Sequence, residues 1–185
     1  MKKILLYLSA FVPLYFLVIL KIIIDIINSN LSFNILNTLT LILLSILIFL
    51  GIYGANISIQ HNNTIEVKIK ILKKTSITEQ YFLGYFSLFV LFALSFELER
   101  VSMFVVFCII IILIGIVYIK NDLFYINPFL NILGYNFYDI TFINLSNNKG
   151  VQRAKFFYKG NLAPNKLIYF AYLSHENFSM IKKQK

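Results

Sequence analysis

The stretch YINPFLNILGYNFYDITF, residues 125–142, lies where the chain is expected to change from membrane helices to a β subdomain. Asn127 and Pro128 are typical of a helix start, because asparagine caps the first turn and proline fits its first position. Gly134 is typical of a helix end. The helix between them is too short to cross a bilayer. From Tyr135 onward, aromatic and β-branched residues predict a strand. We interpret these four residues as structural positions of a junction.

The composition is that of a polytopic membrane protein. Of the 185 residues, 59% are hydrophobic and 14% are charged, and the mean hydropathy is +0.78, well outside the range of a soluble domain. The net charge of +9 is explained by basic cytoplasmic flanks, so we expect no direct nucleic-acid ligand. The single cysteine, Cys108, excludes an internal disulfide and a CxxC metal site.

Four apolar stretches have the roughly 20 residues that a helix needs to cross a bilayer. They are residues 4–27, 35–53, 78–96 and 101–119. Pro13 predicts a kink in the first, since proline removes a backbone donor. Lys2 and Lys3 precede that stretch as in a signal peptide, but no small-residue cleavage site follows, so we expect an uncleaved span.

The distribution of basic residues predicts the orientation. Fifteen of the 17 lysines and arginines precede the first span, separate the second from the third, or follow the fourth. Because cytoplasmic flanks carry this excess, both termini of the multi-pass protein are expected on the cytoplasmic side of the inner membrane. The expected division is residues 1–54 (two helices), 55–77 (cytoplasmic loop with a basic strand), 78–119 (two helices) and 120–185 (cytoplasmic junction helix and β-meander).

The parts expected in the cytoplasm predict a small sheet. Residues 135–143, 151–159 and 166–174 have strand character and are separated by polar turns, which favours an antiparallel meander. In the loop, residues 65–71 alternate between isoleucine or valine and glutamate or lysine, which predicts a fourth strand with one basic face. Such a sheet is marginal alone and needs the membrane face, its own copies or a partner. An edge strand would offer unpaired backbone groups to another chain, and residues 180–185 can equally be a disordered basic tail.

Polar groups near the outer boundary have two interpretations. Lys21 and Asp25 are four residues apart on a helix and can pair at the interface, or they can form a contact between subunits or a vestibule site. Glu97, Glu99 and Arg100 fit a solvated turn, although in a symmetric oligomer the glutamates would repeat as an acidic ring.

Residues that carry catalysis or bind metals are scarce. His61 and His175 have no second ligand at metal spacing, and no phosphate-binding, hydrolase or metalloprotease motif occurs. We therefore expect no catalytic residue, no cofactor, no metal and no enzyme. A channel or transporter of ions or small solutes stays an alternative. Gly84, Ser87 and Ser95 give the third span a smaller surface that suits helix packing or a pathway.

The chain resembles the KwaA family, the membrane subunits of the Kiwa anti-phage defence system. The resemblance lies in the four-span layout, the chain length, LLYLSAFVPLYFLVIL near the N-terminus and the junction YIKNDLFYINPFLNILGYNFYDITF. It implies a homotetramer that responds to phage at the envelope and works with a cytoplasmic DNA-binding subunit, KwaB. It implies no active-site residues. Asn127, Pro128, Gly134 and Tyr135 match the junction as structural positions.

A sensor and scaffold needs a surface that faces its partner. The basic residues expected in the sheet are solvated, contact anionic lipid or dock the partner. We predict docking at Lys68, Lys70, Lys73, Lys74, Arg153, Lys155 and Lys159. A membrane anchor or chaperone that lacks a triggered state is a third interpretation.

Overall fold

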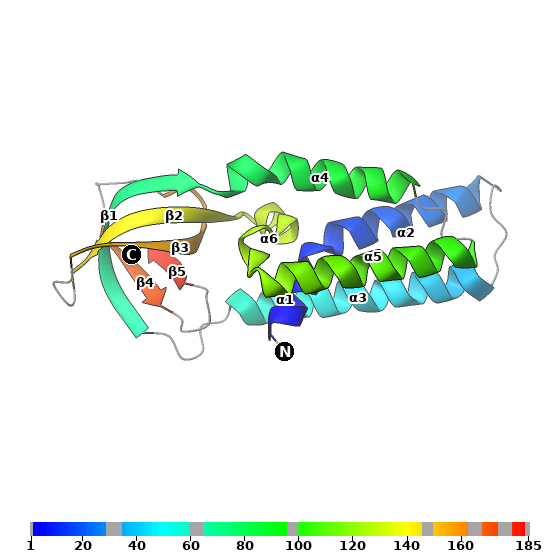
Figure 1. The fold of residues 1–185 in the computed structure, drawn as a ribbon, viewed down its shortest axis with the longest axis horizontal. Helices are drawn as coiled ribbons and strands as arrows, with labels where there is room; N and C mark the ends of the chain where they lie inside the picture. Colours follow the sequence, from blue (N-terminus) through cyan, green and yellow to red (C-terminus); the bar gives the residue numbers. More distant parts are fainter. Residues whose placement is uncertain are drawn as a thin grey trace. The chain divides into compact units, whose positions relative to one another are not determined.

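The computed structural model describes residues 2–28, 35–59, 65–95, 100–145, 150–162, 168–173 and 179–183. The chain divides into two compact units. The helical unit comprises Met1–Ile59 and Leu83–Phe129, and the barrel unit comprises Gln60–Phe82 and Leu130–Lys185. Figure 1 shows the helices and strands of both.

The helical unit contains two helices that are long and apolar enough to cross a membrane. They are the Ile35–Ile57 part of α3 (Ile35–Ile59) and all of α5 (Val101–Lys120). Both leave most of their surface exposed, with 22% and 17% of the residues buried, as expected for helices in lipid.

The first apolar stretch is broken rather than continuous. It forms α1 (Lys2–Ala10) and α2 (Val12–Ile27), which meet at a 45° bend. The predicted bend is present, but it separates two helices at Phe11 rather than kinking one continuous helix. Pro13 lies in the first turn of α2, where its missing N–H leaves no intrahelical hydrogen bond unmade. The pair makes one further span if it crosses as a unit.

The predicted third span corresponds to α4 (Thr78–Ser95). Among the described helices, α4 is not one of those that are long and apolar enough to cross a membrane, because its first turn has the polar sequence TEQ. Its start belongs to the barrel unit, where the Thr78 hydroxyl accepts a hydrogen bond from the Phe137 N–H at 2.8 Å.

Glycines let α1 and α3 approach closely. A Cβ on Gly51 would lie 3.0 Å from the Leu8 carbonyl oxygen of α1, and one on Gly54 would overlap the Leu5 backbone. Small residues at such crossings allow backbone contact between membrane helices. The two glycines therefore fix the crossing of α1 on α3.

The barrel unit is a five-stranded closed barrel. Its strands are β1 (Ile65–Ser76), β2 (Tyr135–Asn144), β3 (Val151–Lys159), β4 (Ile168–Leu173) and β5 (Ser179–Lys183), in the order β1-β2-β3-β5-β4. β1 pairs with both β2 and β4, and β3 and β5 are parallel. This is the strand order of the five-stranded Greek-key barrel known as the OB-fold. The chain between β1 and β2 contains α4 and α5.

Three predicted tail strands and the loop strand are present, but the simple meander is wrong. β3 and β4 do not pair; β5 lies between them. The physical reason is Ile181 of β5, which is 1% exposed and belongs to the barrel core. That core also contains Ile69, Ile71, Ile140, Phe142, Phe156 and Tyr169. The predicted alternation of β1 is confirmed from Val67 to Ile71, with Lys68 and Lys70 exposed.

A bulge changes the phase of β1. Its register with β2 shifts between Ile71 and Lys73. Beyond the shift, Lys73 is opposite Thr141 and Lys74 is opposite the buried Ile140. A bulge moves the following side chains to the other face. Lys73 is therefore placed on the outer surface, although strict alternation would turn it inward.

Candidate partner-binding face

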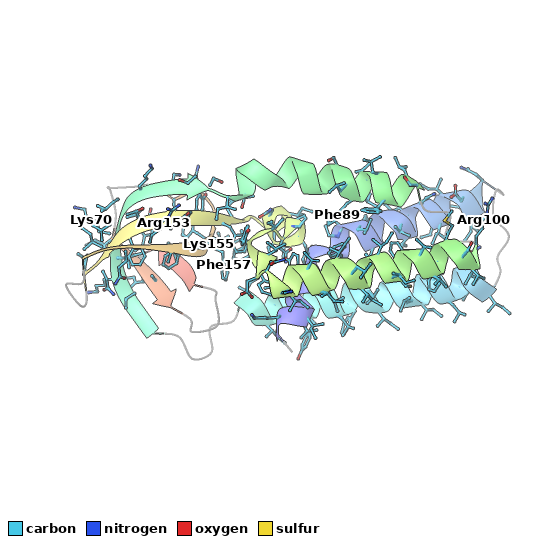
Figure 2. The ribbon with its side chains drawn as sticks, viewed as in Figure 1. Lys70, Phe89, Arg100, Arg153, Lys155 and Phe157 are labelled. Atoms are coloured by element: carbon cyan, nitrogen blue, oxygen red, sulfur yellow. The ribbon has the colours of Figure 1, made fainter. Side chains whose placement is uncertain are left out.

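The outer face of β1, β2 and β3 gathers four of the seven residues predicted to dock a partner. We call Lys70, Lys73, Arg153 and Lys155 the basic face. All four side chains are exposed, and Lys70, Arg153 and Lys155 are labelled in Figure 2. Strand register aligns Lys73 with Thr141 and Arg153 in one row across the sheet.

The neighbouring row contains the acidic residue of this face. Thr75 is opposite Asp139, which is in turn opposite Lys155. Asp139 also accepts two hydrogen bonds from Arg153, at 2.9 Å from Nε and 2.6 Å from Nη2. The resulting fork is a bidentate ion pair. Four cations and one carboxylate leave this face with an excess of positive charge.

The ion pair changes the acidity of both groups. The hydrogen bond from Arg153 is the largest cause that lowers the pKa of Asp139, and the nearby charges of Arg153 and Lys155 lower it further. The same hydrogen bond raises the pKa of Arg153. Asp139 therefore stays ionised at neutral pH, and Arg153 keeps its charge.

A small open hollow lies within this surface. Its volume is about 120 Å³, and it is lined by Lys73, Thr75, Asp139, Thr141 and Arg153. Two hydroxyls and two cationic groups thus share one concavity with a carboxylate already bound to Arg153. Such a surface suits anionic oxygen atoms that accept hydrogen bonds.

The other three predicted docking residues contact the barrel. Lys74 Nζ donates to Asn161 Oδ1 at 2.8 Å and to the Leu162 carbonyl at 2.5 Å. Lys68 lies over the Phe170 ring at 5.8 Å, and Lys159 lies over the Tyr135 ring at 5.6 Å. Lys74 therefore holds the chain after β3, while Lys68 and Lys159 lie on aromatic surfaces beside the basic face.

Two junction residues lie in the helical unit. Pro128 begins α6 (Pro128–Ile132), as predicted. Asn127 is fully buried, and its side-chain amide donates to Ser9 Oγ at 2.7 Å and to the Leu6 carbonyl at 3.4 Å. Leu6 and Ser9 lie near the end of α1, and the Ser9 hydroxyl itself donates to the Leu6 carbonyl at 2.7 Å. Asn127 thereby binds the broken end of α1.

The other two junction residues lie in the barrel unit. Gly134 has φ +84°, a conformation that favours glycine, and its carbonyl accepts from the Gly160 N–H at 3.0 Å. Tyr135 is buried at the start of β2 and packs against the Phe157 ring. Both therefore set the entry of the chain into the barrel.

The residues predicted at the outer boundary are only partly described. Lys21 Nζ donates to the Leu94 carbonyl at 3.2 Å, which joins α2 to α4. Asp25 is partly exposed on α2, and Arg100 immediately precedes α5. Glu97, Glu99, His61 and His175 lie outside the described residues. In the part of the chain that is described, no group of three metal-binding side chains occurs.

Several contacts have no local sequence signal. Lys3 forms a 2.6 Å ion pair with Asp122, and Tyr118 donates to the Ile126 carbonyl at 3.0 Å. Like the Asn127 contacts, these tie α1 or α5 to residues 122–127. The sequence indicates these contacts only by placing polar residues in apolar surroundings. Ser9 and Asn127 are both buried, and buried polar groups need hydrogen-bond partners.

One comparison with known proteins gives a match. The family model described as "Anti-phage protein KwaA" matches residues 2–179. No curated protein and no solved structure matches the chain.

Proposed function

Because the chain belongs to the KwaA family of anti-phage proteins, we propose that it is a non-enzymatic sensor and scaffold of the bacterial inner membrane that recruits a cytoplasmic DNA-binding subunit, KwaB. The observation that carries this proposal is the family match over nearly the whole chain. The fold adds a set of apolar helices and a separate barrel with a basic surface.

The membrane arrangement in this proposal has four spans. The α1–α2 pair, α3, α4 and α5 each cross once, so both termini and the barrel lie in the cytoplasm. The basic residues support this orientation, since positive flanks stay on the cytoplasmic side. The polar start of α4 suits a helix that begins at the water interface, with its apolar part in lipid.

We propose a homotetramer in the membrane, as the family resemblance implies. The described helices keep broad apolar surfaces, among them Ile112, Leu113 and Ile116 of α5, each more than half exposed. Lipid and neighbouring copies are the two environments that accept such surfaces. A signal at the envelope would then act through the packing of the spans.

Docking in this proposal uses the basic residues of the barrel. The four cations of the basic face lie on β1 and β3, the two strands that pair with β2. Exposed charges at an interface speed association and select the partner. Lys68 and Lys159 lie beside it and would extend the same surface. Lys74 contributes by holding the chain that follows β3.

The test is a mild-detergent pull-down of the tagged full-length protein from its host, followed by mass spectrometry and native mass measurement. A homo-oligomer with a stoichiometric cytoplasmic partner supports the proposal. Lys70→Glu and Lys155→Glu, made singly, should each reduce the recovered partner at least several-fold. Lys120→Glu, the same charge change at the end of α5, should leave it unchanged. Equal recovery from all three variants would remove the docking site.

A pore is favoured by one observation, the broken α1–α2 pair, since interrupted helices line the pathways of many transporters. Here the groups at the break bind one another: Asn127 occupies Ser9 and the Leu6 carbonyl. We therefore expect purified oligomer in a planar bilayer to show no conductance. Steady ion-selective current would establish the pore instead.

A further inference from the structure

The basic face coincides with the surface that OB-type barrels use for ligands. In those barrels β2 and β3 form the centre of the ligand-binding face, and the ligands include oligonucleotides. In this chain Arg153 and Lys155 lie on β3, and Lys70 and Lys73 lie on the other side of β2, on β1. Strand order and side-chain charge are independent observations, and both select this face.

The side chains of the basic face are of the types that bind the phosphate backbone of nucleic acids. The four cations are joined by the hydroxyls of Thr75 and Thr141, which also bind phosphate oxygens. Among the described residues of this face no aromatic ring is exposed. The cationic and hydroxyl groups of the central rows, from Lys73 to Arg153 and from Thr75 to Lys155, therefore suit phosphate oxygens.

The spacing suits a flexible strand. β1 and β3 are two strand spacings apart, about 10 Å, and alternate residues along a strand are about 6.6 Å apart. A chain that crosses the sheet meets Arg153 and Lys155 first and then Lys73 and Lys70. Asp139 offsets one charge, but its two oxygens are engaged by Arg153.

We infer that the basic face binds the phosphate backbone of single-stranded nucleic acid. The inference rests on the proposed function only in placing the barrel in the cytoplasm, where nucleic acid is present. It departs from the expectation, drawn from the sequence, of no direct nucleic-acid ligand, and it gives the net positive charge a second role beside membrane orientation. Binding is independent of base sequence, because the contacts are to phosphates.

The test uses full-length protein in neutral detergent without any partner. Fluorescence anisotropy of a labelled 20-nucleotide oligodeoxythymidine is measured from 50 to 200 mM salt. With about four phosphate contacts, a slope near −0.7 per contact predicts about 50-fold weaker binding across that range. Lys73→Gln with Lys155→Gln removes two contacts and keeps the Arg153 ion pair. The weakening across the same range should then fall to about sevenfold.

Controls separate this ligand from other anions. Lys21→Gln with Lys120→Gln makes the same charge change on α2 and α5 of the helical unit and should keep the 50-fold weakening. Oligodeoxyadenosine of equal length should bind equally well. Polyglutamate of equal charge, or vesicles containing phosphatidylglycerol, should displace the oligonucleotide weakly.

Three results would overturn the inference. They are equal salt dependence in the two double variants, no binding at 50 mM salt by protein that melts cooperatively, and equal displacement by polyglutamate or vesicles. Each of these leaves the proposed function standing if the partner still co-purifies. Conversely, binding that depends on the basic face, together with no partner in the pull-down, would support this inference and count against recruitment.

Discussion

Asn127 donates a hydrogen bond from its side-chain amide to the hydroxyl of Ser9, 2.7 Å away and 118 positions earlier in the chain. Both residues are fully buried. The bond joins the end of α1 to the residue before α6, so the break in the first apolar stretch is held by a side chain from the junction.

Removing that amide should destabilise the helical unit. Asn127→Ala leaves Ser9 and the Leu6 carbonyl without this donor, at a cost of about 1–3 kcal/mol in the free energy of unfolding. Thermal unfolding in detergent, followed by circular dichroism, should show a lower midpoint. Asn121→Ala is the matched control, since its amide bond to the Val117 carbonyl is exposed. An equal midpoint for both variants would contradict the structural role of Asn127.

Gly54→Ala should loosen the crossing of α1 on α3. Its Cβ would overlap the Leu5 backbone, and overpacking of a close contact costs about 1–3 kcal/mol. We expect a lower midpoint of thermal unfolding in detergent, followed by circular dichroism. Gly84→Ala is the control, because nothing lies within 4 Å of its added Cβ. It should be neutral or stabilising, since alanine favours helix.

Lys74 and Lys73 should differ despite being neighbours. Lys74→Ala removes two hydrogen bonds to Asn161 and Leu162, and bonds to a charged donor contribute about 1.5–3 kcal/mol each when buried. The partial exposure of Lys74 makes the lower end the expectation. Lys73→Ala alters an exposed side chain and should change the melting midpoint little. Limited proteolysis after β3 should accelerate only in Lys74→Ala.

The Asp139–Arg153 pair should show itself at acid pH. The pKa of Asp139 is lowered in the folded protein, chiefly by the hydrogen bond from Arg153. Its contribution to stability is therefore complete above the unfolded pKa of about 3.9 and is lost as pH falls through the lower folded value. The difference in melting midpoint between wild type and Asp139→Asn should be constant from pH 7 to about pH 5 and shrink below about pH 4.

A different pH dependence would identify another group as responsible. Because Arg153 is exposed, the difference should be small. A difference that grows toward acid pH would mean that Asp139 is more stable protonated, contrary to its ion pair. Arg153→Gln alone should remove most of this pH-dependent contribution of Asp139 to the melting midpoint.

Periodic patterns predicted local structure well and long-range pairing poorly. In β1, apolar residues alternate with lysines at Val67, Ile69 and Ile71, and this period was enough to predict the strand and its solvent-exposed face. The bulge after Ile71 has no signal in a strict alternation, so the opposite roles of Lys73 and Lys74 were not predicted. The place of β5 depends on the burial of Ile181, and one buried position in a five-residue strand gives no period in the sequence.

The candidate site was predicted as a list of cations rather than as a surface. Charge identified all seven residues, but only register shows that Lys73 and Arg153 share a row and that Asp139 lies next to it. Likewise, Asn127 was predicted as part of a helix start, and its contacts to α1 depend on how distant helices pack. Such contacts have no local period.

The chain between β1 and β2 has a consequence for biosynthesis. β1 ends at Ser76, and its neighbour β2 begins at Tyr135, after α4 and α5. At 5–20 residues per second, the ribosome needs roughly 3–12 s to synthesise the intervening segment. During that interval β1 has no β2 strand to pair with, and the barrel closes only when β5 has emerged. Closure of the barrel is therefore a late step in biosynthesis. Until then, the unpaired edge of β1 is the part of the chain that a chaperone would have to protect.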